Sequence, residues 1–117
     1  MITLIRKAIS ETMGSASAPF KAFLDLTSST VFAKGFAWKD KIAAGFSNSA
    51  SRSGDKLATL IQIALFAAQQ GMHWVSLGLP PANNSSTGSE EDLNRLGIWL
   101  GASAQSNADE GPDVAPP

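Results

Sequence analysis

Residues 41–78 read KIAAGFSNSASRSGDKLATLIQIALFAAQQGMHWVSLG, and this stretch decides the fold. Its first seven residues carry no charge after Lys41 and are small or apolar, which is typical of a central parallel strand covered by helices on both faces. Apolar residues then recur at the spacing of one helix face, and they predict an amphipathic helix over residues 55–70. The positions in that stripe are Leu57, Leu60, Ile61, Ala64, Leu65 and Ala68.

A second strand is predicted over residues 72–78. Gly71 stands where a helix C-cap would be, and Pro80 with Pro81 forbids the strand to continue. A strand, a helix and a second strand in this order form the βαβ unit, whose strands are parallel and whose crossover is right-handed. The sequence therefore predicts an α/β fold.

The flanking segments extend this pattern in both directions. On the N-terminal side, the small residues of segment 13–19 predict a loop, and Pro19 opens a helix over residues 19–28 that buries Phe20, Phe23, Leu24 and Thr27. Residues 1–9 fit a short strand or a helical turn equally well. On the C-terminal side, residues 83–89 are turn material, residues 90–93 begin a helical turn, and residues 97–104 are apolar again. Residues 106–117 have no apolar periodicity, and a mobile tail is expected there.

Composition excludes several classes of function. The 117 residues carry a net charge of −1, contain no Cys and include one His, His73. A disulfide scaffold, a thiol nucleophile and a metal site built from several His are therefore excluded. The balanced charge argues against nucleic acid as a partner. The longest apolar run, residues 63–68, is far shorter than the roughly 20 residues of a membrane span, and the start does not resemble a signal peptide. A cytoplasmic protein without a membrane partner is expected.

The loop that follows the first strand is the natural place for a ligand, because open α/β sheets bind ligands beyond the carboxyl ends of their strands. Residues 47–54 there combine hydroxyl and amide side chains with a helix start, which suits an oxygen-rich planar or anionic ligand. A solvated turn that caps the helix explains the same composition and is the more frequent case. The loop at residues 13–18 has the same two interpretations. His73 and the three Trp residues are more often structural than catalytic.

Three motifs in order resemble a known family. They are MGSASAPFKAFLD at residues 13–25, KIAAGFSNSAS at residues 41–51 followed by Gly54, and GMHWV at residues 71–75. The chain resembles the flavodoxin-like NAD(P)H-dependent oxidoreductases of the tryptophan-repressor-binding-protein and quinone-reductase type over residues 12–108. The resemblance implies a doubly wound parallel sheet, FMN as cofactor, transfer of electrons from NAD(P)H to a quinone-like small-molecule acceptor, and a homo-oligomer.

The resemblance also implies which residues contact FMN. One flavin loop of the family corresponds to Met13, Gly14 and Ser15, and the next corresponds to Ser47, Asn48, Ser49, Ala50, Ser51 and Gly54. A late loop of the family, near the flavin and often from a neighbouring subunit, corresponds to residues 97–104 and implies a role for Trp99. Where the family often has a His before its Gly-Met pair, this chain has Gln70.

The start of the chain departs from the family. Family members open with strands and a phosphate-binding turn, whereas residues 1–11 match neither, and the family's closing helix would follow Pro117. The sequence is thus expected to form an incomplete flavodoxin-like domain over residues 1–117, with an unmatched start at 1–11 and a mobile tail at 109–117. Two hypotheses follow. One is an FMN-binding NAD(P)H-dependent oxidoreductase, impaired by truncation and dependent on a homo-oligomer or on the missing N-terminal half. The other is a cofactor-free structural or subunit-interaction fragment.

Overall fold

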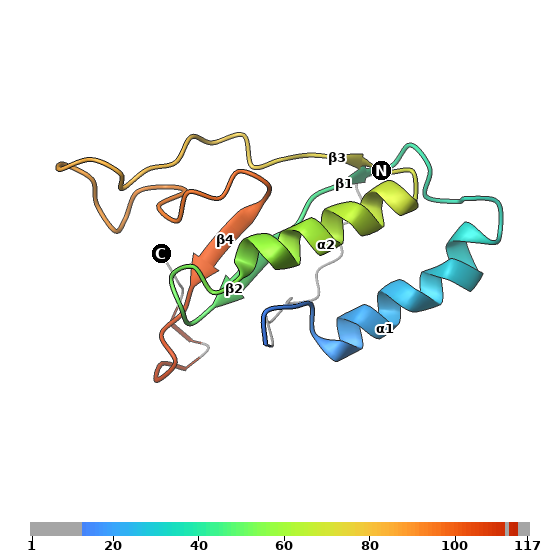
Figure 1. The fold of residues 1–117 in the computed structure, drawn as a ribbon, viewed down its shortest axis with the longest axis horizontal. Helices are drawn as coiled ribbons and strands as arrows, with labels where there is room; N and C mark the ends of the chain where they lie inside the picture. The colour runs from blue at the N-terminus through green and yellow to red at the C-terminus, as the bar shows by residue number, and fades with distance from the viewer. Residues whose placement is uncertain (1–12, 112, 115–117) are drawn as a thin grey trace.

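A computed structural model describes residues 13–111, 113 and 114 of the chain (Figure 1). Helix α1 (Ala18–Thr27) continues into a π-helical turn, η1 (Ser28–Phe32), and helix α2 (Lys56–Gln69) follows two short strands. The strands are β1 (Ile42–Ala43), β2 (Phe46–Ser49), β3 (His73–Trp74) and β4 (Ala102–Gln105). The predictions for residues 1–11 lie outside the described residues.

Both strand pairs are parallel: β1 pairs with β3, and β2 pairs with β4. The bonds run from the backbone N–H groups of His73, Val75, Ala102 and Ser106 to the carbonyl oxygens of Lys41, Ala43, Gly45 and Ser49, at 2.8, 2.8, 3.1 and 3.2 Å. These four acceptors lie at positions 41, 43, 45 and 49, which are separated by even numbers of residues. Their carbonyl groups therefore point to the same edge of one extended segment. β1 and β2 therefore lie along one extended segment, residues 41–49, which is interrupted at residues 44 and 45, and β3 and β4 pair with it one after the other.

The long segment between β3 and β4 interrupts their common strand. Ala102 takes the place that Leu77 would hold if β3 simply continued, because Val75 and Ala102 bond to the successive same-edge carbonyls of Ala43 and Gly45. The N–H of Leu77 bonds instead to the carbonyl oxygen of Trp99, at 3.1 Å. The strand predicted over residues 72–78 is thus shorter than expected, whereas the predicted parallel βαβ unit is confirmed.

Helix α2 forms as predicted, but its buried face differs from the predicted stripe. Leu60 is fully buried, and Ile63 and Ala67 are buried with it. The side chains of Leu57, Ile61 and Leu65 are 49%, 45% and 61% exposed, so burial of the whole predicted stripe is wrong. The reason is the position of α1, which lies beside α2 (Figure 1) and brings Phe20 and Leu24 against Ile63 in one core cluster.

The ends of the two helices are tied together. Gln70 Nε2 donates a hydrogen bond of 2.9 Å to Thr27 Oγ1, which itself donates to the carbonyl of Leu24 at 2.6 Å. The helix predicted over residues 19–28 is confirmed, although Phe23 is 37% exposed and does not join Phe20 and Leu24 in the core. Gly71 has a φ of +68°, as the predicted C-cap requires.

The sheet is covered on one face only within the described part of the chain. A Cβ atom at Gly45 would lie 3.1 Å from Leu60 and 2.7 Å from the ring of Trp74, so this side of the strand faces α2. On the opposite face, Ile42, Phe46 and Val75 are 48%, 42% and 48% exposed. The expected helical cover on both faces is therefore wrong for the residues described, because both helices lie on the side of Gly45.

The C-terminal segment differs from the predictions in one place. Residues 90–93 form hydrogen-bonded turns rather than the start of a helix, with the Asp92 carboxylate accepting the N–H groups of Ser89 and Asn83 at 2.9 and 3.3 Å. Beyond β4, residues 107–110 form a turn, and mobility of residues 109–117 stays a prediction. Within the part of the chain that is described, no helix is both long and apolar enough to cross a membrane.

Candidate functional site

Two of the predicted ligand loops meet at the start of α2. A Cβ atom added to Gly14 would lie 3.4 Å from the Asp55 carboxylate, and Ser15 Oγ donates a hydrogen bond of 3.0 Å to Gln62 Oε1 on α2. Met13 and Gly14 both have left-handed backbone, with φ of +55° and +77°, and the Met13 side chain is almost fully exposed. The structure thus brings Met13, Gly14 and Ser15 to the loop that precedes α2.

The first residues of the other predicted loop belong to strand β2. Ser47, Asn48 and Ser49 pair with β4, so the loop begins at Ala50 and not at Ser47. The Ser47 side chain is buried, and its hydroxyl has no hydrogen-bond partner among the described residues. Asn48 Nδ2 donates to Ser106 Oγ at 2.7 Å. The Ser47 side chain is thus largely enclosed by the strand pair, and its contact with a ligand stays a prediction.

The turn into α2 depends on Gly54. Gly54 and Asp55 both have left-handed backbone, with φ of +52° and +56°. A Cβ atom at Gly54 would lie 1.8 Å from Ser49 Oγ, which donates to the carbonyl of Ser51 at 3.1 Å. Any side chain at this position would therefore collide with the hydroxyl that closes the loop. This close approach explains why a glycine stands at position 54, and the FMN contact expected of Gly54 stays a prediction.

Sequence reasoning missed Lys56, the first residue of α2. Its side chain is fully buried, and Nζ lies 2.5, 2.9 and 3.5 Å from the carbonyl oxygens of Ser51, Arg52 and Ser53. A lysine at the edge of an amphipathic helix is normally assigned to solvent. The available signal was its place in the first helical turn, where the helix dipole disfavours a cation unless something else holds it.

The loop presents a row of backbone donors. The N–H groups of Arg52, Ser53 and Gly54 donate to no acceptor among the described residues. Such donors suit a ligand rich in oxygen and nitrogen acceptors, and the adjacent start of α2 adds a favourable field for negative charge. The residues present therefore fit the acceptor-rich ring of a flavin.

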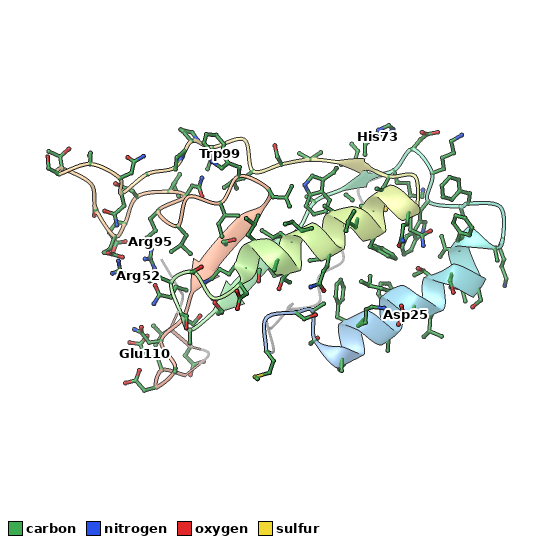
Figure 2. The ribbon with its side chains drawn as sticks, viewed as in Figure 1. Asp25, Arg52, His73, Arg95, Trp99 and Glu110 are labelled. Carbon is green, nitrogen blue, oxygen red and sulfur yellow. The ribbon has the colours of Figure 1, made fainter. Side chains whose placement is uncertain are left out.

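Two clefts adjoin this strand and loop. One, of about 600 Å³, is lined by Arg52, Ser53, Asp55, Leu57, Ala58, Ile61, Asn83, Arg95, Leu96 and Ile98. Glu90 joins its two arginines, with distances of 3.0 Å to Arg52 and 2.7 Å to Arg95. Figure 2 shows Arg52 and Arg95 near each other. The other cleft, of about 570 Å³, lies beside Phe46, Ser47 and Asn48 and beside the β4 segment that follows Gly101. The loop of residues 50–55 thus lines the first cleft, and the strand residues that come just before it line the second.

The flavin contact expected of Trp99 stays a prediction. Figure 2 places Trp99 on the long segment between β3 and β4, well apart from Arg52, and its side chain is 60% exposed. His73 lies at the other end of the sheet, with Nε2 3.4 Å from the Asp40 carboxylate. In the described ranges, no group of three or more His, Asp or Glu side chains is arranged to hold a metal ion.

Comparisons with known proteins agree with the resemblance in the sequence. A family model described as NADPH-dependent FMN reductase matches residues 8–85. The chain is 46% identical over 104 residues to flavodoxin FldP of Pseudomonas aeruginosa strain UCBPP-PA14, a match that covers 89% of this chain and 55% of that protein. The crystal structure of a WrbA-like flavodoxin from Agrobacterium tumefaciens superposes with a TM-score of 0.62 at 36% identity, covering 85% of this chain and 49% of that one.

These matches confirm the predicted flavodoxin-like α/β fold. The chain spans about half the length of the relatives that it matches. The two small parallel sheets and two helices agree with part of such a fold rather than the whole of it.

Proposed function

This chain belongs to the NADPH-dependent FMN reductase family, and on that premise we propose that it binds FMN and acts as an NAD(P)H-dependent oxidoreductase. The observation that carries the proposal is the junction of the two loops at the start of α2. There Gly14 lies against Asp55, and three successive backbone N–H groups of the second loop have no acceptor among the described residues. A ligand with a planar, acceptor-rich ring satisfies both features.

The proposed roles follow from the positions of the residues. Met13, Gly14 and Ser15 provide a backbone surface on which the ring lies, and their left-handed turn leaves the Met13 side chain free to cover it. Ser49, Ala50, Ser51 and Gly54 form the second wall. Ser47 and Asn48 support that wall from β2. FMN supplies the hydride chemistry when bound, and the protein supplies orientation and hydrogen bonds rather than an acid or a base.

We further propose a quinone-like small molecule as the electron acceptor and either NADH or NADPH as the donor. The apolar side chains of Leu57, Ile61 and Ile98 beside Arg52 and Arg95 suit a flat molecule with polar edges. Trp99 is proposed to act in a homo-oligomer, where its exposed ring reaches the site of a neighbouring copy. We propose an N-terminal half of such a domain, supplied separately, as the alternative companion.

A specific observation favours a second candidate function, a cofactor-free structural or subunit-interaction fragment. Ile42, Phe46 and Val75 form an exposed apolar row on the open face of the sheet. Exposed apolar surface of this kind drives association with another protein layer. In that case the chain packs against another subunit and binds no flavin.

An FMN titration separates the two functions. Oxidised FMN is titrated into the purified chain and followed by its fluorescence and visible absorbance. We expect the unmodified chain to bind FMN and the double variant Ser49→Leu with Ser51→Leu to bind it on the order of 100-fold more weakly, because bulky side chains fill the ligand's place. Ser76→Leu, at an exposed serine outside the loops, is the matched control.

Each result has one meaning. Unchanged affinity in the double variant would remove the loop of residues 47–54 from the site. If the unmodified chain leaves the fluorescence and absorbance of FMN unchanged up to the highest concentration titrated, the result would support the structural fragment instead.

A further inference from the structure

The Lys56 side chain is the one lysine that the described structure encloses completely. Burying an ammonium group is costly unless polar groups replace its water shell. Its Nζ donates to one short stretch of the loop, the carbonyl oxygens of Ser51, Arg52 and Ser53, at 2.5, 2.9 and 3.5 Å. The charge is therefore placed directly beneath the loop that precedes α2.

The direction of these carbonyls fixes the direction of the donors. The peptide bonds of the described residues contain no cis bond, and in a planar trans peptide the C=O and the following N–H point in opposite directions. When the carbonyls of residues 51–53 turn inward to Nζ, the N–H groups of Arg52, Ser53 and Gly54 must turn away from it. Arg52 and Ser53 are exposed, so this row of donors faces outward.

Few other contacts hold the loop in this arrangement. Ser49 Oγ bonds to the carbonyl of Ser51, Gln105 Nε2 bonds to the carbonyl of Ala50 at 3.1 Å, and the Lys56 N–H bonds weakly to the carbonyl of Ser53 at 3.3 Å. None of these contacts orients the peptide between Arg52 and Ser53. Among the described residues, the hydrogen bond to the Arg52 carbonyl comes from Lys56 Nζ, at 2.9 Å.

We propose that Lys56 is a positioning residue, which turns three carbonyls inward so that the N–H groups of Arg52, Ser53 and Gly54 are held ready for acceptor atoms of the flavin ring. The inference rests on the proposed function and deepens it. The buried positive charge also strengthens these donors toward the acceptor atoms of the ring, because water does not screen it. Lys56 acts through the loop and does not itself touch the ligand.

The test compares Lys56→Met with Lys34→Met, the same substitution at an exposed lysine. In the ligand-free chain, ¹⁵N relaxation reports backbone order at residues 52–54 and, as an internal reference, at residues 60–66 of α2. Equilibrium titrations then measure the affinity for FMN and for riboflavin, which has the same ring and no phosphate. Lys56→Arg, which keeps the charge and the donors, tests for rescue.

We expect Lys56→Met to make residues 52–54 mobile while residues 60–66 stay ordered, and Lys56→Arg to recover part of the loop order. We expect Lys56→Met to weaken FMN and riboflavin by the same factor, on the order of tenfold or more. Rigid residues 52–54 in Lys56→Met, a loss of order throughout α2, or a loss of affinity for FMN alone would each overturn the proposal. If the unmodified chain takes up neither flavin, the proposed function fails, and the loop order in Lys56→Met still decides whether Lys56 positions the donors.

Discussion

The two faces of the extended segment of residues 41–49 differ in the size of their side chains. The face toward α2 carries Ala43, Gly45 and Ser47, which are small. The opposite face carries Ile42 and Phe46, with Val75 from the neighbouring strand, and these large apolar side chains are about half exposed. Small residues let a helix approach closely, whereas large ones fill the space beneath a more distant layer.

This difference teaches that when a strand is apolar on both faces, its sequence alone does not show which face is packed against helices of the same chain. Both faces follow the pattern of a doubly wound sheet. In the described chain, however, both helices lie on the small-residue face (Figure 1). Among the described residues, no helix covers the large-residue face. The following substitutions test the contrast.

The largest effect is expected at the centre of the covered face. Leu60 is fully buried against Gly45 and Gly101, so Leu60→Ala should lower the free energy of unfolding by about 2–5 kcal/mol. Ile61, one residue further and nearly half exposed, should lose less than about 1 kcal/mol as Ile61→Ala. Urea unfolding of both variants measures the two values. Equal losses would mean that the two helix faces are equally buried and would remove the contrast.

An intermediate effect is expected where the two strands approach each other. A Cβ atom at Gly101 would lie 2.4 Å from the Gly45 carbonyl oxygen and 2.9 Å from Leu60, so Gly101→Ala must displace backbone. We expect a loss of about 1–3 kcal/mol in the free energy of unfolding. Gly111→Ala is the control, because nothing lies within 4 Å of the added atom. Thermal unfolding temperatures that match in the two variants would contradict the close packing.

The smallest effect on stability is expected on the open face. Replacing Ile42 and Phe46 together by Lys should change the free energy of unfolding by less than about 0.5 kcal/mol, because both side chains are already partly in water. The association of the chain should change instead, since charge disfavours contact between exposed apolar surfaces. Light scattering should give a larger mass for the unmodified chain than for the variant. A compact monomer in both cases would show that this face does not associate.

The sequence predicted those features that depend on local pattern. The α2 helix, its cap at Gly71 and burial of Leu60 follow from residues close together in the chain. Exposure of Leu57 and Ile61 could not be predicted, because it depends on where α1 packs and which faces lack a covering layer.

The candidate site was also predicted in part: its loops were identified, but some positions within it were not. The loops at Gly14 and Gly54 were identified, and they do meet. The interior position of Ser47 depends on how far β2 extends, which is a matter of pairing with β4. Lys56 was missed because pattern analysis places lysine in solvent, and only the folded loop provides carbonyls for it. Trp99 was grouped with the loops by resemblance, and its role stays a prediction; the structure places it on the long segment between β3 and β4.

The interruption between β3 and β4 has a consequence for the entropy of folding. Residues 76–101 form a long loop. The residues that flank it, Val75 and Ala102, donate to the successive same-edge carbonyls of Ala43 and Gly45. The entropic cost of closing a loop rises only with the logarithm of its length, by about 0.6 kcal/mol for each doubling. The loop of residues 76–101 can therefore lengthen or shorten at little cost in free energy. The strand pairing keeps its register at the end where the loop to α2 begins. A change in the length of segment 76–101 therefore need not change the geometry of the strand ends.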